Sequence, residues 1–300
     1  MENIRAASLI TAIKTPYLLD GEIDIEAYDS LVEFQIQHGV DGIIVGGTTG
    51  EGHLMDWEEH LMLISHSVHK FGHKLLIIGN TGSNNTYEAI KATHFGFASG
   101  MHASLQINPY YGKTSRAGLL THFQKVLDLG PAIVYNVPGR TGQDLVPEVM
   151  LKLAEHANFA GIKECTGSDR IKSYEDRGIA CWSGNDDDSF TSRYESRSHG
   201  VISVTSNLVP GLMKRLMKEK DEALKIRLMP LISWLFSEPN PIPLNTAMSM
   251  LGCAKPVIRL PYVPLDRTMR QKGVEILQSF QGELPGTTIN VMEDEAFILL

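Results

Sequence analysis

A lysine lies in a stretch of sequence that otherwise has the character of a buried strand. Lys163 stands in FAGIKECTG, residues 159–167, among apolar and small residues. A single lysine at the edge of a strand ordinarily lays its stem on apolar surface and keeps its ammonium group in water. The alternative is an amine whose pKa burial lowers, and such an amine is a nucleophile towards a carbonyl carbon. The residues that the fold brings to the same place decide between the two.

Polar side chains also follow the other short apolar runs of the chain. Singly, each is explained equally well as a helix cap or a loop residue. Together they supply an amine, a phenol and a pair of hydroxyls, which suit carbinolamine and imine chemistry on a ketone, and this chemistry requires no metal. The residues at the ends of the runs are Thr48, Thr49, Asn80, Thr81, Tyr110, Tyr111, Tyr135, Arg140, Lys163, Glu164, Gly184, Asn185 and Ser203, all polar except Gly184.

The apolar runs indicate a parallel sheet, because they are nearly continuous rather than alternating. They lie at 8–17, 41–50, 74–83, 102–111, 131–140, 159–168, 179–187 and 200–207. Helical patterns separate them, for example at 25–39, which closes on Gly39, and at 55–72, where Asp56 and Glu59 resemble a capping box. Strands alternating with helices over this length predict an α/β fold, a (β/α)₈ TIM barrel, whose strand ends meet on one face.

After Asn207 the pattern changes, and helical segments follow one another without a strand between them. We therefore expect a catalytic barrel over 1–225 and a C-terminal helical extension over 226–300. No repeat or low-complexity tract interrupts the chain.

Composition excludes several classes of protein. The 300 residues are 43% hydrophobic with a formal net charge of −8 and no basic run, which argues against nucleic acid or an anionic membrane as the main partner. No apolar run is long enough to span a membrane. Cys165, Cys181 and Cys253 are isolated, so neither a disulfide framework nor a thiolate metal site is expected. The acidic run at 185–188 is typical of a solvated loop, and we expect no metal.

Several motifs, in order and spacing, resemble the dihydrodipicolinate synthase family of Schiff-base-forming lyases. They are GGTTGEG (46–52), NPYYGKTS (108–115), YNVPGRTG (135–142), GIKECTG (161–167) and GVISVTSN (200–207). The strings LITAIKTPY, WSGNDD, EPNPI and RLPYVPL are similar to the plant-type branch in particular. The resemblance covers nearly the whole chain. It departs at Gly139, where many relatives have serine, and at 188–200.

The resemblance implies a role for four catalytic residues. Lys163 would form an imine with pyruvate, and Tyr135 would relay protons and hold the bound pyruvate. Thr48 would link Tyr135 into a proton chain, which Tyr111 would close from a neighbouring subunit. No cofactor is implied.

The same resemblance implies the binding of both substrates. Thr49 and adjacent amides would hold the pyruvate carboxylate, and Arg140 would bind the carboxylate of L-aspartate 4-semialdehyde at the entrance. Gly184 and Ile202 would line the floor through backbone atoms. The implied reaction is the 4-hydroxy-tetrahydrodipicolinate synthase condensation, on the diaminopimelate route to lysine.

Inhibition by L-lysine, at a pocket between subunits, is also implied. The residues that match this site are Gly52, His53, Trp57, His60, Asn84, Glu88 and Tyr110. Taken without the resemblance, Trp57 and His60 are ordinary helix residues. A homotetramer, arranged as a dimer of dimers, and a location in the plastid stroma, with a transit peptide outside this chain, are implied as well; the cytosol is the alternative.

Two other functions remain open. One is a different pyruvate-dependent aldolase on the same barrel, such as an N-acetylneuraminate or keto-deoxy-sugar acid lyase, although the doubled tyrosine of NPYYGK favours the synthase. The other is a catalytically silent amino-acid-binding homologue, against which the presence of Lys163, Tyr135 and Tyr111 argues.

Overall fold

The eight apolar runs form eight parallel strands that close into a barrel. Each strand is hydrogen-bonded to the next in sequence, and β8 returns to β1, in a computed structural model that describes residues 1–300. The strands are β1 (Leu9–Ala12), β2 (Gly42–Val45), β3 (Leu76–Asn80), β4 (Ala103–Ile107), β5 (Ala132–Asn136), β6 (Phe159–Glu164), β7 (Cys181–Ser183) and β8 (Gly200–Ser203). The predicted TIM barrel is confirmed.

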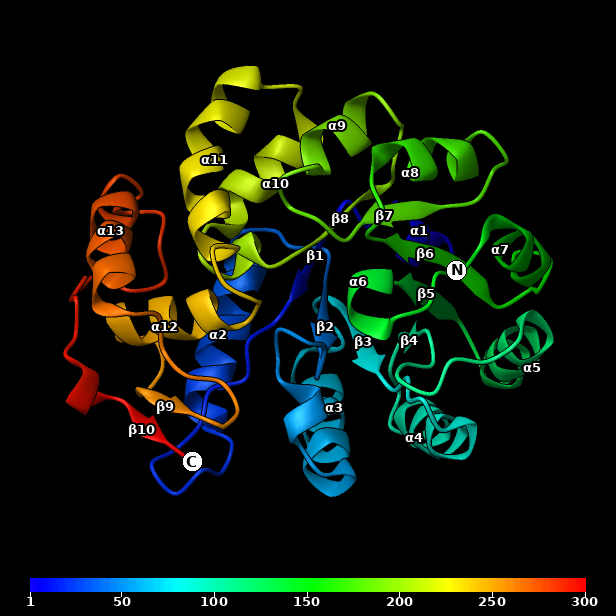
Figure 1. Ribbon diagram of the computed structural model, residues 1–300, viewed down its shortest axis with the longest axis horizontal. Coiled ribbons are helices and arrows are strands. Elements are labelled where there is room, and N and C mark those ends of the chain that lie inside the picture. Colours follow the sequence, from blue (N-terminus) through cyan, green and yellow to red (C-terminus); the bar gives the residue numbers. More distant parts are fainter.

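Helices surround the barrel, as Figure 1 shows. They are α1 (Glu2–Ala6), α2 (Ile25–Gln37), α3 (Trp57–Phe71), α4 (Thr86–Ala98), α5 (Arg116–Leu127), α6 (Pro138–Thr141), α7 (Pro147–Leu153), α8 (Ser168–Glu175), α9 (Ser189–Tyr194) and α10 (Pro210–Lys218). Short 3₁₀ turns are η1 (Gly52–Leu54), η2 (Thr205–Asn207) and η3 (Asp294–Ala296).

Side-chain caps explain where several helices begin. The Asp56 carboxylate accepts a hydrogen bond from the Glu59 amide at 2.8 Å, which satisfies a free N–H group of the first turn of α3. Asp24 and Ser115 cap α2 and α5 in the same way. Gly39 follows α2 with a φ of +70°, the left-handed conformation that a glycine adopts without steric cost.

Strand register places the chemistry at one end of the barrel. Tyr135 of β5 is paired with Lys163 of β6, and Lys163 is paired with Trp182 of β7. All of these residues stand near the carboxyl ends of their strands, where the βα loops of such barrels meet.

The inside of the barrel is packed with apolar side chains, so it is a core and not a pore. Ile10, Ile44, Ile78 and Ile133 are all buried in one cluster that also includes Trp182. The Trp182 indole N–H donates to the Ala7 carbonyl at 2.7 Å. The bond joins β7 to the segment just before β1 and gives the buried indole N–H the partner that it needs.

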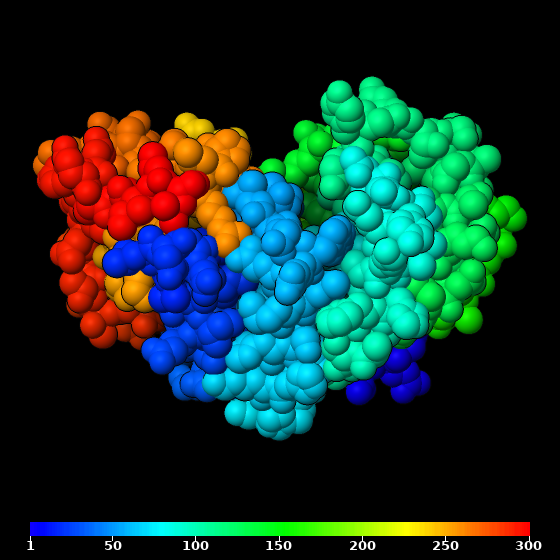
Figure 2. Space-filling view, turned by 90° about the horizontal axis from the view of Figure 1, so that it is seen from below, coloured from blue at the N-terminus to red at the C-terminus, as the bar shows by residue number.

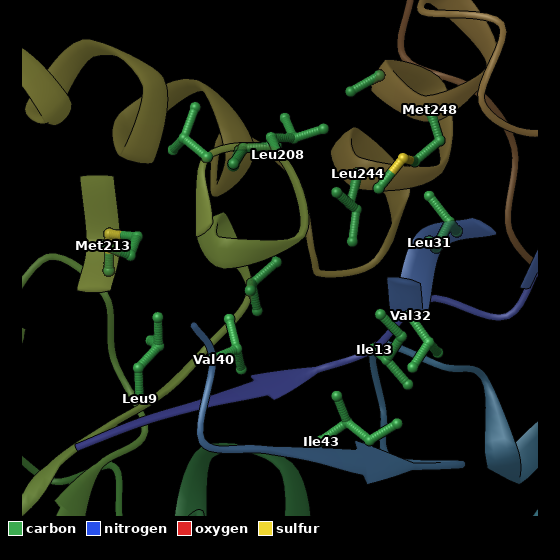
Figure 3. Close-up of a cluster of buried hydrophobic side chains, with 14 of the residues drawn as sticks. Leu9, Ile13, Leu31, Val32, Val40, Ile43, Leu208, Met213, Leu244 and Met248 are labelled. Atoms are coloured by element: carbon green, nitrogen blue, oxygen red, sulfur yellow. The ribbon is translucent and has the colours of Figure 1, made fainter. Parts of the chain in front are cut away.

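A larger apolar core lies between the barrel and the helices that follow it (Figure 3). Leu9 lies below Met213 there, Ile13 lies beside Val32, and Leu244 and Met248 approach from the C-terminal part of the chain. The C-terminal segment is thus joined to the barrel by a shared hydrophobic core.

The C-terminal part contains α11 (Glu222–Leu235), α12 (Ile242–Met250) and α13 (Arg267–Gln278). It also contains a two-stranded parallel sheet of β9 (Val257–Ile258) and β10 (Ile298–Leu299), which the helical pattern did not predict. The division expected between 225 and 226 falls inside α11, which is continuous because Leu224, Leu228 and Leu231 are all buried on one face. None of the helices has the length and apolar character needed to cross a lipid bilayer.

Candidate active site

Lys163 is buried in a cavity at the carboxyl ends of the strands, called here the Lys163 cavity. Only 8% of its surface is exposed, and the cavity has a volume of about 260 Å³. Its ammonium nitrogen lies 4.3 Å from the centre of the Tyr135 ring. The structure therefore places the amine inside the barrel mouth. This excludes the interpretation of Lys163 as a strand-edge lysine that keeps its ammonium group in water.

Burial controls the protonation of both groups. Desolvation lowers the pKa of Lys163, and the nearby Arg140 guanidinium lowers it further, while Cys165 and Asp186 act in the opposite direction. Burial raises the pKa of Tyr135 well above its ordinary value. Burial therefore increases the neutral fraction of the amine and keeps the phenol protonated, and attack on a ketone needs both.

A turn after β2 brings two hydroxyl groups to the same cavity. Thr48 and Thr49 both line it, and the Thr49 hydroxyl accepts a hydrogen bond at 3.1 Å from the Asn240 side-chain amide. Asn240 is itself buried and lines the cavity, although it comes from the loop before α12. The Thr49 hydroxyl is thus held from the C-terminal part of the chain.

Arg140 lies on the short helix α6, which stands over the barrel mouth in Figure 1. One of its guanidinium N–H groups donates to the Asn240 carbonyl at 3.0 Å. A side chain at Gly139 would meet open space, so the absence of serine there leaves the presentation of Arg140 unobstructed. The guanidinium is available to a carboxylate that enters the cavity.

Gly184 lies against the stem of Lys163. A Cβ atom at this position would be 2.3 Å from the Cys165 sulfur and 3.1 Å from Cε of Lys163. Only glycine leaves both side chains where they are. Ile202, by contrast, is buried in β8 and does not line the cavity, and Val204 lines it instead.

Tyr111 is the one predicted catalytic residue that stays outside the cavity of its own chain. It is 95% exposed, and its backbone has a φ of +68°, which is uncommon for a residue with a side chain. The loop after β4 therefore projects the phenol into solvent.

A second cavity of about 410 Å³ opens beside the first. Figure 2 shows the mouth as a hollow between the light-blue surface around α3 and the green surface that follows β4. Six of the seven residues predicted for lysine binding line the second cavity: Gly52, His53, Trp57, His60, Glu88 and Tyr110. Thr48, Asn80 and Arg140 line both cavities.

The walls of the second cavity combine aromatic rings with one carboxylate. The rings of Trp57 and His60 are stacked, with centroids 5.4 Å apart and an interplanar angle of 4°. Glu88 accepts a hydrogen bond from the Ser83 hydroxyl at 3.1 Å. Asn84, which does not line the cavity, donates to the Tyr110 carbonyl at 3.3 Å and so supports the loop that does.

The sequence matches the Dihydrodipicolinate synthetase family over residues 5–280. The chain belongs to this family. The chloroplastic 4-hydroxy-tetrahydrodipicolinate synthase of Nicotiana tabacum is 56% identical over 305 residues, covering 100% of this chain and 84% of that protein. The chloroplastic 4-hydroxy-tetrahydrodipicolinate synthase 1 of Arabidopsis thaliana is 55% identical over 302 residues, covering 100% and 83%.

Solved structures of dihydrodipicolinate synthases share the fold. The Acinetobacter baumannii enzyme, described as chloride-inhibited and complexed with pyruvate, has a TM-score of 0.87 at 35% identity and covers 91% of this chain and 98% of its own. The Cyanidioschyzon merolae enzyme with lysine bound has a TM-score of 0.86 at 31% identity, covering 92% and 98%.

The sequence did not point to all the residues of this dihydrodipicolinate synthetase site. Asn240, Cys165 and Phe236 line the Lys163 cavity, and Tyr262 lines the second, where its hydroxyl lies 2.8 Å from a His53 ring nitrogen. For Asn240 and Tyr262 the signal was present in EPNPI and RLPYVPL, but these strings lie far from the strand ends in sequence. Cys165, by contrast, directly follows β6. No three His, Cys, Asp or Glu side chains come together in an arrangement that holds a metal ion.

Proposed function

We infer that the chain catalyses the 4-hydroxy-tetrahydrodipicolinate synthase reaction, the condensation of pyruvate with L-aspartate 4-semialdehyde in lysine biosynthesis. The observation that carries this inference is the buried Lys163 amine beside the Tyr135 ring, in a chain at least half identical to plant enzymes of this name along its whole length.

The first half of the reaction captures pyruvate covalently. The neutral Lys163 amine attacks the ketone carbon, and loss of water from the carbinolamine gives an imine. Tyr135, kept protonated by burial, donates to the departing oxygen and later takes back a proton. Thr48 connects Tyr135 to a proton chain, and Thr49 with its neighbouring amides holds the pyruvate carboxylate.

The second half forms the carbon–carbon bond. The former methyl group of pyruvate loses a proton, and the resulting enamine attacks the aldehyde carbon of the semialdehyde. The semialdehyde's amino group then displaces Lys163 by transimination, which closes the ring and releases the free enzyme. Arg140 at the mouth of the cavity pairs with the semialdehyde carboxylate and orients the aldehyde towards the enamine.

An assay with two substrates tests the proposed function against its rivals. Pyruvate and L-aspartate 4-semialdehyde should disappear in equal amounts, while N-acetylneuraminate should not be cleaved. Cleavage of the sugar acid without condensation would favour the other aldolases, and pyruvate binding without turnover would favour a silent homologue.

The second cavity supports regulation by L-lysine. The carboxylate of Glu88 is suited to the ammonium group of the inhibitor, and the stacked Trp57 and His60 rings offer a surface for its apolar stem. Because Tyr110 lines this cavity and Tyr111 follows it directly, a bound lysine has a short route to the catalytic proton chain.

Substitution of Glu88 tests the assignment of the inhibitor site. Glu88→Gln keeps the shape of the side chain and removes its charge, so about tenfold more lysine should be needed for half-inhibition. Lys91→Gln, one turn further along α4 and outside the cavity, is the control. Unchanged inhibition of the Glu88→Gln enzyme would place lysine elsewhere.

The exposed Tyr111 supports a homotetramer, a dimer of dimers, in which each tyrosine completes a neighbour's site. Mixing inactive Tyr111→Phe subunits with inactive Lys163→Ala subunits should restore activity, because one mixed pair contains an intact site. No recovery after reassembly would show that Tyr111 acts otherwise. Sedimentation gives the assembly state independently.

A plastid stroma is the proposed location, because the plant relatives named above are chloroplastic. Fractionation of the source cells, followed by immunodetection of the protein, distinguishes this compartment from the cytosol.

A further inference from the structure

The turn at residues 48–53 lines both cavities. Thr48 and Thr49 line the Lys163 cavity, and Gly52 and His53 line the second. Glu51 stands between them, lines neither cavity and has no exposed surface. A buried carboxylate at this position must have charged or hydrogen-bonding partners, because an unpaired charge in the interior is strongly unfavourable.

The partners of Glu51 come from two distant parts of the chain. One carboxylate oxygen lies 2.6 Å from the Lys14 ammonium, just beyond β1, and the other accepts a hydrogen bond at 2.6 Å from the Asn245 side-chain amide on α12. Lys14 is itself 3% exposed and also donates to the Thr15 carbonyl at 2.5 Å. The carboxylate thus ties the turn to the first strand and to the C-terminal segment.

The backbone of the turn is strained and tightly packed. Glu51 has a φ of +59°, a conformation that a side chain disfavours and that persists where surrounding contacts impose it. A Cβ atom at Gly50 would be 2.7 Å from the Ile13 carbonyl oxygen, and one at Gly52 would be 2.0 Å from the Gly46 carbonyl oxygen. Neither Gly50 nor Gly52 has room for a side chain. Glu51, which lies between them, is therefore the residue whose side chain anchors the turn.

We propose that Glu51, held by Lys14 and Asn245, is a positioning residue that fixes the Thr48–Thr49 turn for binding the carboxylate of pyruvate. It touches no substrate and acts through the threonines. The Glu51 amide donates to the Thr48 carbonyl at 3.1 Å, which connects the anchor directly to a residue that lines the Lys163 cavity. This proposal rests on the proposed function, because it takes pyruvate as the ligand of the turn.

The test separates substrate binding from chemistry and from folding. Glu51→Gln keeps the shape but loses the charge that Lys14 pairs with, so the KM for pyruvate should rise about tenfold while kcat falls less. The double variant Lys14→Met/Glu51→Gln removes both charges of the Lys14–Glu51 pair, so neither is left unpaired, and it is the variant to use if a single substitution folds poorly. Its KM should be no higher than that of the worse single variant, because the two residues act as one unit.

A partly buried ion pair at the other end of the barrel supplies the control. Asp41, just before β2, lies 2.5 Å from the Lys214 ammonium. Asp41→Asn should lower the unfolding temperature without changing the KM for pyruvate. An unchanged KM in Glu51→Gln, or an equal rise in Asp41→Asn, would overturn the proposal. Failure of the parent chain to form a borohydride-trapped pyruvate adduct would instead overturn the proposed function, and this proposal with it.

Discussion

Replacing Tyr135 with phenylalanine removes a single oxygen atom from the Lys163 cavity. The ring keeps its place above the Lys163 ammonium, 4.3 Å away, and its packing among the apolar residues of the barrel interior. What disappears is the phenol that burial keeps protonated. The substitution therefore tests proton transfer with little change in shape or in the environment of the amine.

The expected loss follows from the role of the hydroxyl. A positioned general acid or base contributes about 10²- to 10⁴-fold to a rate, which corresponds to about 3–5 kcal/mol in the activation free energy. We expect kcat of Tyr135→Phe to fall within this range. The free energy of unfolding should change little, because the ring and its packing in the barrel interior are retained and the only side-chain partner of the hydroxyl is the Cys165 thiol, a weak hydrogen-bonding group.

The assay is the initial rate of condensation at saturating pyruvate and varied L-aspartate 4-semialdehyde, with thermal unfolding measured on the same samples. Tyr174→Phe is the matched control, since Tyr174 is equally buried but lies on α8, outside the cavity. A Tyr135→Phe enzyme that keeps more than about a tenth of the parent kcat would refute the assignment of Tyr135 as the proton relay.

Two further predictions concern packing and pH. Gly184→Ala should lower kcat about a hundredfold, because the new methyl group displaces Cys165 and Lys163; a folded variant with the parent rate would contradict this. Burial lowers the pKa of His122 from 6.5 to about 4, so the native state resists protonation that the unfolded chain accepts. As the pH falls below 6.5, the unfolded chain gains a proton at His122 that the native state does not bind. The free energy of unfolding should therefore decrease by about 2 kcal/mol between pH 7 and 5. Urea unfolding at both pH values should show a smaller loss in His122→Gln, and an equal loss would refute the role of His122.

The barrel and its central pair were predictable because local pattern and topology agree. Nearly continuous apolar runs give strands buried on both faces, and parallel strands that close into a barrel bring Tyr135 and Lys163 side by side. The second cavity was less predictable from local pattern, since Trp57 and His60 have ordinary helical spacing and were identified through the resemblance alone.

The contribution of the C-terminal part was not predictable in the same way. Asn240 reaches Thr49, and Asn245 reaches Glu51, across nearly two hundred residues of sequence, so their positions depend on how the helices pack. Strands of two residues, such as β9 and β10, are too short to leave a periodic pattern. The boundary at 225 was expected from the change from alternating strands and helices to helices alone, and such a change of pattern does not locate the ends of a single helix such as α11.

Covalent capture of pyruvate by one amine is the central claim, and reduction of the complex with borohydride tests it most directly. After incubation with pyruvate and borohydride, mass spectrometry of the digested protein should locate the added mass on Lys163 and nowhere else. The Lys163→Ala variant should form no adduct and should not condense the substrates. The absence of an adduct on Lys163, or condensation by Lys163→Ala at the parent rate, would contradict the account.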